Sequence, residues 1–336
     1  MKKTLYFRVD GDEGKKSGLG HIYRTLKIYN CLKKKFKESV NFVFLSKYNL
    51  GIKILRKKTE EKVILWNNKN FKKLQILKND FVIIDTLGIE KKLLKFFNKI
   101  KFENLISFDE INRDFRKGLI INGIFFAKKK MESTKKLTVY QGPKYIILDK
   151  KYSKKIKKFN KNKNCIISCG GADKKNFLYK ITKILINYKF NKIFVIIGKG
   201  VKKNDKVLKL KDKKVKFVKN SENLKKYFDK AQLAIVSGGT VMFEAIASGI
   251  FTLVIKNYDH QKYAINFFNN KNNITYLGSL KSIENSQLFK KNIINFLSKK
   301  HILNKNFFKN TRLIDGYGLQ RTKKILCQFI IKRKKN

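Results

Sequence analysis

Short apolar runs alternate with longer, lysine-rich segments along the first half of the chain. The apolar runs are TLYFRV, NFVFLS, KVILW, DFVIID, NLISF and GLIIN, each of the length of a buried strand. The intervals carry apolar positions at helical spacing, for example over residues 22–35 and 90–99. Strands that alternate with helices form a parallel sheet through βαβ units. The first half therefore predicts an α/β domain.

The same alternation restarts after a basic stretch without a core pattern, KYSKKIKKFNKNK. Strands are predicted at NCIISCG, KIFVIIG, KVKFV, LAIVS, FTLVI and ITYLG, with helices over residues 176–188, 223–229, 241–248 and 261–269. We expect two doubly wound, Rossmann-like domains with a cleft between them at the carboxyl ends of the strands. Their expected bounds are 1–150 and 164–318, with a linker at 151–163 and a final helix over 319–336 that crosses back to the first domain.

Composition narrows the class of protein. The 336 residues are 43% hydrophobic, as in globular proteins. The most apolar span, AQLAIVSGGTVMFEAIASGIFTLVIKN, reaches the length of a membrane helix, but Glu244 and a Ser-Gly-Gly turn interrupt it. The apolar run at the N-terminus is too short for a signal peptide, so we expect a soluble, cytoplasmic protein. The four cysteines form no CxxC pair, and no metal site or cofactor is expected.

The formal charge of +56, from 80 Lys and Arg against 24 Asp and Glu, is extreme. Taken alone, it would indicate nucleic acid or an anionic membrane as a partner. However, the basic residues are mostly lysine and are spread through every segment, and the richness in Asn, Ile, Phe and Tyr follows AT-rich codons. We therefore expect no dedicated nucleic-acid partner, although the positive field favours an anionic small substrate.

The stretch SGLGHIYR holds the first candidate for chemistry. Gly18 and Gly20 allow a tight turn before a helix, whose N-terminal N–H groups favour an anion. His21 would stand at the mouth of the cleft, where an imidazole titrating near neutrality can take a proton from water or a hydroxyl. The alternative is a histidine that only caps or packs the helix start. Short glycine motifs alone do not separate the two.

The second half contains a matching strand, turn and helix in LAIVSGGTVMFEA. The backbone N–H groups of its turn, with the Ser and Thr hydroxyls, would hold a diphosphate. Glu244 would bind the ribose hydroxyls, or would simply favour the helix start through the helix dipole. SCGGADKKN has the same pattern, with Asp173 at a helix cap, and can also be a simple tight turn. The residues predicted to contact substrate in this half are Gly170, Gly171, Ser237, Gly238, Gly239, Thr240, Glu244, His260 and Gln261.

These residues together resemble a known family. The matches are Arg8 and Asp10 before GLGHIYR, Ile83 to Asp85, Ser107 to Glu110, Gly142 to Tyr145, Cys169 to Asp173, Ser237 to Glu244, and Asp315 to Gly318 with Arg321. They cover nearly the whole chain in order. The chain resembles the UDP-sugar hydrolases of pseudaminic acid biosynthesis and the related spore-coat polysaccharide proteins. Its Ser-Gly-Gly-Thr and Asp-His-Gln blocks also resemble the glycosyltransferases that add N-acetylglucosamine to the lipid-linked peptidoglycan precursor, which have the GT-B fold.

The resemblance implies a metal-independent site for a UDP-sugar, in which His21 is catalytic and Asp10, Gly18, Gly20, Arg24 and Asp85 bind the substrate. In those hydrolases the histidine acts as a base on water, which attacks the anomeric carbon with inversion and releases UDP. The substrate implied is a UDP-linked 2,4-diacetamido-2,4,6-trideoxy sugar, used for surface polysaccharide. The chain departs from the family at Leu87, where a tyrosine is common, and at Asp149, where an arginine is usual. A GT-B glycosyltransferase and a binding protein without catalysis therefore stay open as alternatives.

Overall fold

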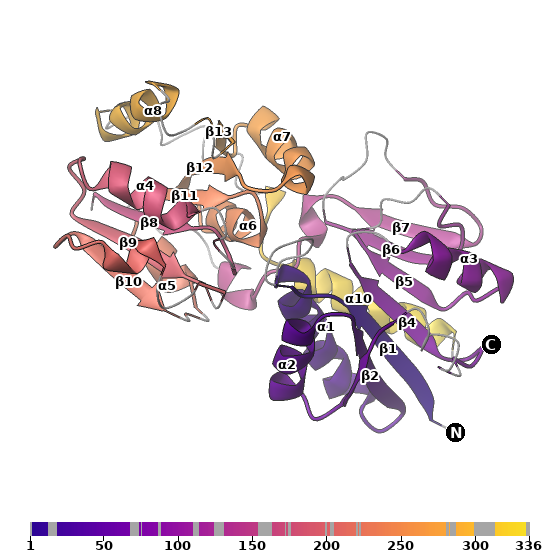
Figure 1. The fold of residues 1–336 in the computed structure, drawn as a ribbon. Coiled ribbons are helices and arrows are strands. Elements are labelled where there is room, and N and C mark those ends of the chain that lie inside the picture. Colours follow the sequence, from indigo (N-terminus) through magenta and orange to yellow (C-terminus); the bar gives the residue numbers. More distant parts are fainter. Residues whose placement is uncertain are drawn as a thin grey trace. The chain divides into compact units, whose positions relative to one another are not determined.

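The chain folds into two units, each built around its own parallel sheet (Figure 1). Unit 1 comprises Met1–Leu148 and Tyr317–Asn336, and unit 2 comprises Asp149–Gly316. The computed structural model describes residues 2–12, 19–67, 74, 76–86, 89–109, 114–123, 131–153, 163–171, 173, 176–198, 200–201, 205–219, 221, 223–279, 282, 287–298 and 313–333. The two units are treated separately below.

Unit 1 contains a seven-stranded sheet in the order β3-β2-β1-β4-β5-β6-β7, with every neighbouring pair parallel. Its strands are β1 (Lys3–Val9), β2 (Val40–Ser46), β3 (Lys62–Leu65), β4 (Phe81–Asp85), β5 (Leu105–Phe108), β6 (Gly118–Asn122) and β7 (Leu137–Gln141). Its helices are α1 (Gly20–Phe36), α2 (Asn49–Lys58), α3 (Lys91–Lys99), η2 (Pro143–Tyr145) and α10 (Gly318–Lys332). Because the strand order reverses between β1 and β4, this point is the topological switch of a doubly wound sheet.

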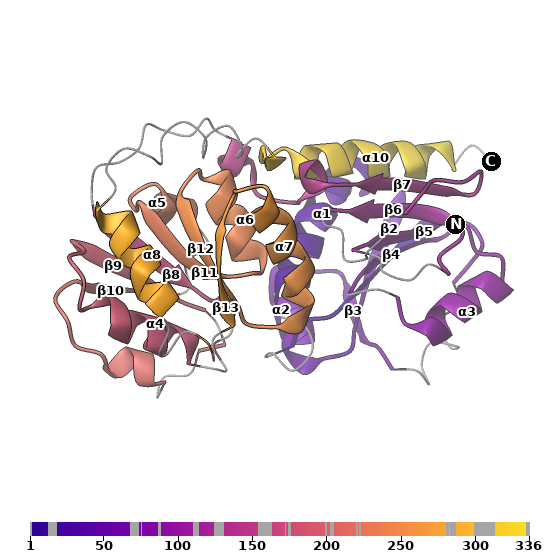
Figure 2. The same cartoon turned by 90° about the horizontal axis from the view of Figure 1, so that it is seen from above.

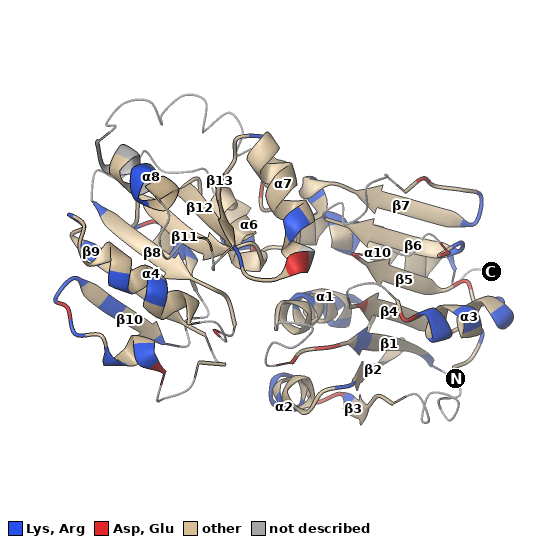
Figure 3. Ribbon diagram, turned by 45° about the horizontal axis from the view of Figure 1, so that its top comes forward, with Lys and Arg blue, Asp and Glu red and all other residues tan. Residues whose placement is uncertain are grey.

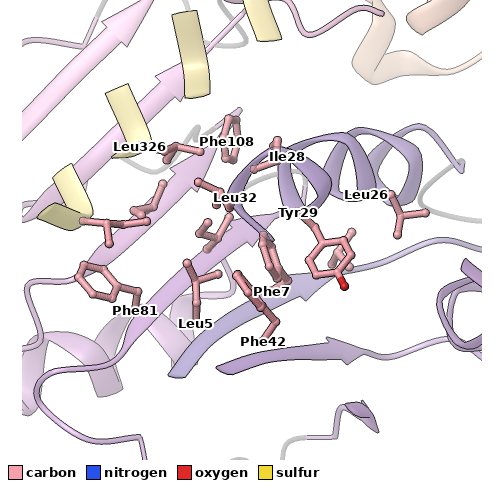
Figure 4. Close-up of a cluster of buried hydrophobic side chains, with 14 of the residues drawn as sticks. Leu5, Phe7, Leu26, Ile28, Tyr29, Leu32, Phe42, Phe81, Phe108 and Leu326 are labelled. Carbon is pink, nitrogen blue, oxygen red and sulfur yellow. The ribbon is translucent and has the colours of Figure 1, made fainter. Parts of the chain in front are cut away.

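Helices cover both faces of this sheet because successive side chains of a strand point to opposite faces. On β1, Leu5 and Phe7 enter a core that α1 and α10 close (Figure 4). In this core Phe7 stacks on Phe44, with ring centroids 5.0 Å apart. Tyr6 enters the opposite core, which contains Leu93, Leu94 and Phe97 of α3. The central strands are thus buried on both sides, which accounts for their almost continuously apolar sequences.

The last helix, α10, belongs to unit 1 although unit 2 precedes it in the sequence (Figure 2). Leu326, Cys327 and Ile330 are buried in the same core as Leu32 of α1 (Figure 4). Phe329 contacts Phe81 of β4 edge to face, with ring centroids 6.5 Å apart. Without α10, this part of the apolar surface of α1 and β4 would be exposed to water.

Unit 2 contains a six-stranded parallel sheet in the order β10-β9-β8-β11-β12-β13, which reverses between β8 and β11. Its strands are β8 (Asn164–Ser168), β9 (Lys192–Ile197), β10 (Val215–Lys219), β11 (Leu233–Ser237), β12 (Phe251–Lys256) and β13 (Thr275–Ser279). Its helices are η3 (Lys150–Ser153), α4 (Phe177–Leu185), η4 (Lys206–Lys209), α5 (Lys225–Phe228), α6 (Thr240–Ala247), η5 (Asp259–Gln261), α7 (Lys262–Asn270) and α8 (Gln287–Ser298). Both units therefore repeat one topology.

Unit 2 also buries both faces of its sheet. Val195 of β9 packs in a core with Phe177 of α4 and Phe289 of α8. The neighbouring side chain, Phe194, points to the other face and contacts Tyr227 of α5, with ring centroids 5.5 Å apart. The N-cap residue of α4 is Asn176 rather than Asp173, but the Asp173 carboxylate still accepts the backbone N–H groups of Phe177 and Leu178 at the start of the helix.

Every strand that the alternation predicts is present, and the two doubly wound α/β units confirm the predicted fold class. β7 was not predicted, and neither α2 nor α8 was identified. The expected linker is partly wrong: Lys150–Ser153 form η3, and Tyr152 is buried rather than solvated. The lysines beside Tyr152 indicated a solvated segment, whereas the Tyr152 side chain packs in unit 2. Residues 154–162 of that stretch lie outside the described residues.

Basic side chains are spread over the elements of both units (Figure 3). Lysines occur on α3, on α4 and on β10, and they are not concentrated on any single described element (Figure 3). Within the part of the chain that the structure describes, no helix combines the length and apolar character needed to cross a bilayer.

Candidate active site

A first candidate site lies at the topological switch of unit 1. Val9 of β1 pairs with Asp85 of β4, so the carboxyl ends of the two strands lie side by side. In open α/β sheets, ligands bind outside these strand ends at the switch point. Asp85 is the last residue of β4, and its carboxylate is 1% exposed. A buried carboxylate needs several polar partners, and α1 supplies them.

Three side chains in the first turns of α1 reach Asp85. His21 Nδ1 lies 2.7 Å from Asp85 Oδ1, and Thr25 Oγ1 donates to Oδ2 over 2.8 Å. Arg24 Nε donates to Oδ2 over 2.9 Å, and Arg24 Nη2 donates to Oδ1. Residues three and four positions apart share one helix face, which explains why the GHxxR spacing brings these groups together. The sequence identified His21, Arg24 and Asp85, and the structure joins them.

Arg24 is shared between two carboxylates. Its Nη1 donates to Oδ2 of Asp109 over 2.5 Å, and its guanidinium lies 5.8 Å from the ring centre of Phe108. Burial alone would lower the pKa of Arg24, but Asp109 and Asp85 hold it well above its usual range. Burial would likewise raise the pKa of Asp85, but Arg24 and His21 hold it well below its usual range. Arg24 and Asp85 are therefore both charged at neutral pH, and Arg24 acts as an internal counterion.

The contact with Asp85 defines the tautomer of His21. An ionised carboxylate only accepts hydrogen bonds, so the 2.7 Å contact requires the proton on Nδ1. The neutral ring then carries its lone pair on Nε2, which is the arrangement of a general base held by a carboxylate. The His21 side chain is 19% exposed, so solvent reaches it, while Asp85 is enclosed.

A second arginine, Arg8, forms an ion pair with Asp10. Arg8 donates to both carboxylate oxygens of Asp10, over 2.5 and 2.8 Å, and Lys47 N donates to Oδ1 over 2.9 Å. Arg8 also stacks over Trp66 at 5.0 Å and contacts Glu90 over 3.2 Å. Asp10 therefore holds loops together at the end of β1.

The glycines of the first motif are only partly described. Gly20 is the first residue of α1, whereas Gly18 and Leu87 lie outside the described residues. Asp109 was missed as a site residue. A signal existed, because Asp109 directly follows a buried strand that neighbours β4, but the sequence alone did not give the strand order. Thr25 was missed because nothing in the sequence distinguishes it from an ordinary residue within a helix.

A second candidate site lies at the switch of unit 2, between β8 and β11. Ser237 Oγ donates to the carbonyl oxygen of Cys169 over 3.0 Å and so ties the loops after both strands. This hydroxyl, expected to face a diphosphate, is buried and already used. Gly170 has φ 89°, a conformation that favours glycine, and the carbonyl of Gly171 accepts the N–H of Gly200 over 2.8 Å. The two glycines thus shape the turn and pack it on its neighbour.

The turn before α6 is partly exposed at the start of the helix. α6 begins at Thr240, which is exposed, and Gly239 precedes it as the N-cap. A side chain on Gly238 would come within 2.6 Å of Ile265, so a glycine lets this turn pack closely against α7. The first N–H groups of a helix have no partner within the helix, and such groups favour an anion.

Gln261 adds a side-chain donor to this turn. Its Oε1 accepts the N–H groups of Asn257 and Tyr258 over 3.0 and 3.2 Å. Because the oxygen is fixed in this way, the amide nitrogen points away from those donors. Nε2 is the atom that a Cβ on Gly239 would approach, at 3.7 Å. The backbone of His260 forms part of η5, and its side chain lies outside the described residues.

Glu244 lies one turn into α6 and is half-buried. Its neighbour is Tyr152 of η3, whose pKa is raised by burial and by the negative charge of Glu244. The Tyr152 hydroxyl therefore stays protonated beside the carboxylate. Asp149, one of the two departures from the resembled family, pairs with Lys151 over 3.3 Å. The described residues contain no cluster of three or more His, Cys, Asp or Glu side chains placed to hold a metal ion.

Comparisons with known proteins agree with this fold. No protein-family model matches the chain. The chain is 32% identical over 289 residues to the protein MJ1062 of Methanocaldococcus jannaschii, covering 79% of this chain and 58% of that protein. It is 24% identical over 342 residues to the spore coat polysaccharide biosynthesis protein SpsG of Bacillus subtilis, covering 96% and 98%. The chain thus spans 58% of the first relative and nearly all of the second.

Solved structures define the fold class. MurG of Acinetobacter baumannii matches with a TM-score of 0.61 at 12% identity, over 98% of this chain and all of that one. HepE of Anabaena, in complex with UDP-glucose, matches with a TM-score of 0.55 at 12% identity, over 97% and 99%. Glycosyltransferases of the GT-B class recur among the similar structures, and the chain has two Rossmann-like units in the GT-B fold. At these identities the likeness concerns the fold alone.

Proposed function

We propose that the protein hydrolyses a UDP-linked sugar at the anomeric carbon and releases UDP and the free sugar in polysaccharide biosynthesis. The observation that carries this proposal is the pair of His21 and Asp85 at the switch point of unit 1, with Nδ1 bound to a buried carboxylate. The name of SpsG supports a place in polysaccharide biosynthesis, and the UDP-glucose bound to HepE supports a nucleotide sugar as substrate. The resembled hydrolases support a 2,4-diacetamido-2,4,6-trideoxy sugar.

Unit 2 would bind the nucleotide. The N–H groups of Gly239 and Thr240 belong to the start of α6, where an anion is favoured, and the amide of Gln261 would add a donor beside them. These groups would hold the diphosphate of UDP. Glu244, one turn further on, would accept the ribose hydroxyls, with Tyr152 beside it. In this proposal Gly170 and Gly171 shape the neighbouring loop rather than donate to the ligand.

Unit 1 would carry the chemistry. Nε2 of His21 takes a proton from water as the water oxygen forms a bond to the anomeric carbon. The bond between that carbon and the β-phosphate oxygen breaks, and its electron pair leaves with UDP. Attack opposite the leaving group inverts the anomeric configuration. Asp85 holds the imidazole and stabilises the imidazolium that forms, and the donors in unit 2 stabilise the charge gained by UDP. This reaction needs no metal ion.

A panel of UDP-sugars, incubated with the protein in the absence of any acceptor, tests the proposal. UDP release without acceptor supports hydrolysis, whereas release only after addition of a lipid or glycan acceptor would identify a glycosyltransferase. His21→Asn keeps much of the shape and hydrogen bonding of the side chain but cannot act as a base. General-base assistance contributes about 10²–10⁴-fold, so kcat should fall by that order while UDP affinity is kept.

The control separates catalysis from folding. The single tryptophan, Trp66, is buried in unit 1 and reports on the integrity of the unit that carries His21. If His21→Asn keeps its Trp66 emission and the hydrolysis rate of the wild type, the general-base role is wrong. Asp10 and Asp85 are poor substitutes for it, because both are already ion-paired with arginine.

A further inference from the structure

Asp109 is a buried carboxylate that the proposed reaction does not use directly. It follows β5, its side chain is 6% exposed, and it contacts Arg24 Nη1 over 2.5 Å. Its backbone has φ 52°, in the left-handed region, and its N–H donates to the carbonyl oxygen of Ile121 over 3.4 Å. Asp and Asn enter this region more easily than other residues with side chains, yet the conformation is still strained. The strained backbone presents the carboxylate to Arg24.

The position of Arg24 bears on the tautomer of His21. Arg24 Nη2 lies 3.1 Å from His21 Nδ1. Both atoms are nitrogen donors when Nδ1 carries its proton, so this approach is not a hydrogen bond in the arrangement that Asp85 imposes. If Arg24 moved further toward His21, an N–H group would face Nδ1 and favour a lone pair there. The proton would then belong on Nε2, and the base would be lost.

We propose that Asp109 is a positioning residue, which holds Arg24 by Nη1 and thereby keeps the proton of His21 on Nδ1. This inference rests on the proposed function, because it assigns a role within the same site. Asp109 draws one end of the guanidinium away from His21, while Asp85 binds the other end. Oδ1 of Asp85 accepts the Nδ1–H group of His21 alongside Arg24 Nη2.

Charge balance supports the same assignment. Asp85 and Asp109 carry two negative charges against the one positive charge of Arg24, so the group has a net charge of −1 beside a neutral His21. When His21 takes a proton, the group becomes neutral. Without the Asp109 charge, the same step would leave a net positive charge in a largely enclosed site, which is unfavourable. Asp109 therefore favours the imidazolium as well as the correct tautomer.

Asp109→Asn tests the assignment with little disturbance of the backbone. Asn has the same shape and also tolerates positive φ, so strain and packing are retained while the charge is removed. We expect kcat to fall by about 10–100-fold, the usual effect of losing a partner that orients a functional histidine, with unchanged UDP affinity. ¹⁵N NMR of the imidazole should show the Nδ1–H tautomer in the wild type and a shift toward Nε2–H in the variant. With three histidines in the chain, His21→Asn assigns the signal.

Asp80→Asn is the matched control. Asp80 is a buried carboxylate of unit 1 just before β4, where it accepts the N–H groups of Thr4 and Leu77 over 2.7 and 2.9 Å. Its loss should lower stability without changing the tautomer or the kcat of the folded protein. The inference is overturned if Asp109→Asn keeps either the wild-type kcat or the wild-type tautomer. The NMR measurement needs no substrate, so it decides the role of Asp109 even if no UDP-sugar is hydrolysed.

Discussion

Asp85 should stabilise unit 1 as well as orient His21. We expect Asp85→Asn to lower the free energy of unfolding of unit 1, since the carboxylate accepts hydrogen bonds from His21, Arg24 and Thr25. Removing one partner of a buried ion pair costs about 3–5 kcal/mol. Because Arg24 keeps Asp109 and Asn still offers one acceptor oxygen, the lower end, about 3 kcal/mol, is expected at neutral pH.

Urea denaturation followed by Trp66 fluorescence measures this loss in unit 1 alone. Trp66 is the one tryptophan of the chain and is 4% exposed beside Arg8, so unit 2 gives no tryptophan signal. With a urea dependence of about 2 kcal/mol per molar for a unit of this size, a loss of about 3 kcal/mol lowers the midpoint by about 1.5 M.

The difference between Asp85→Asn and the wild type should also depend on pH. The folded-state pKa of Asp85 is depressed, after Arg24 and His21 overcome the effect of burial. A depressed carboxyl pKa contributes stability above the unfolded value of about 3.9, and this contribution is lost as pH falls toward the folded value. The stability difference should thus be about 1 kcal/mol smaller near pH 3 than near pH 5. An unchanged urea midpoint, or the same difference at both pH values, would refute this reasoning.

Two further variants probe unit 2. Glu244→Ala should weaken UDP binding by about 1–3 kcal/mol in isothermal titration calorimetry, because the ribose hydroxyls lose a charged acceptor, and an unchanged affinity would exclude that role. Asp173→Ala should destabilise unit 2 by about 0.5–2 kcal/mol, because the N–H groups of Phe177 and Leu178 lose their acceptor over 2.6 and 2.9 Å. Hydrogen exchange should accelerate first at these two amides, and equal protection in both proteins would contradict the cap.

The sequence predicted most of the fold because both sheets are parallel and buried on both faces. Their central strands are continuous apolar runs, such as Phe81–Asp85 and Leu233–Ser237, which stand out from lysine-rich surroundings. β7 was missed because it is an edge strand in which only Leu137 is buried. Its sequence, LTVYQ, does not separate an edge strand from a loop.

The site was predicted less completely, because several of its contacts join residues that lie far apart in the sequence. GHxxR placed His21 and Arg24 on one helix face, because that spacing is local. Arg24 was expected to bind substrate, yet its charge is matched by Asp85 and Asp109, which lie 61 and 85 residues away in the sequence. Only the order of the strands brings these carboxylates to one edge. The burial of Tyr152 was missed for a similar reason, because it depends on packing in unit 2 rather than on the neighbouring lysines.

The position of α10 after unit 2 in the sequence affects how the protein folds during its own synthesis. Ribosomes make the chain from the N-terminus, and domains generally fold as units while synthesis proceeds. All of unit 2, Asp149–Gly316, emerges before the helix that closes the core of unit 1. Unit 2 can therefore complete its fold first, while the surfaces of Leu32 and Phe81 that α10 covers stay open. The nascent chain carries an unfinished N-terminal unit for most of its synthesis, and this is the period in which chaperones would have an apolar surface to bind.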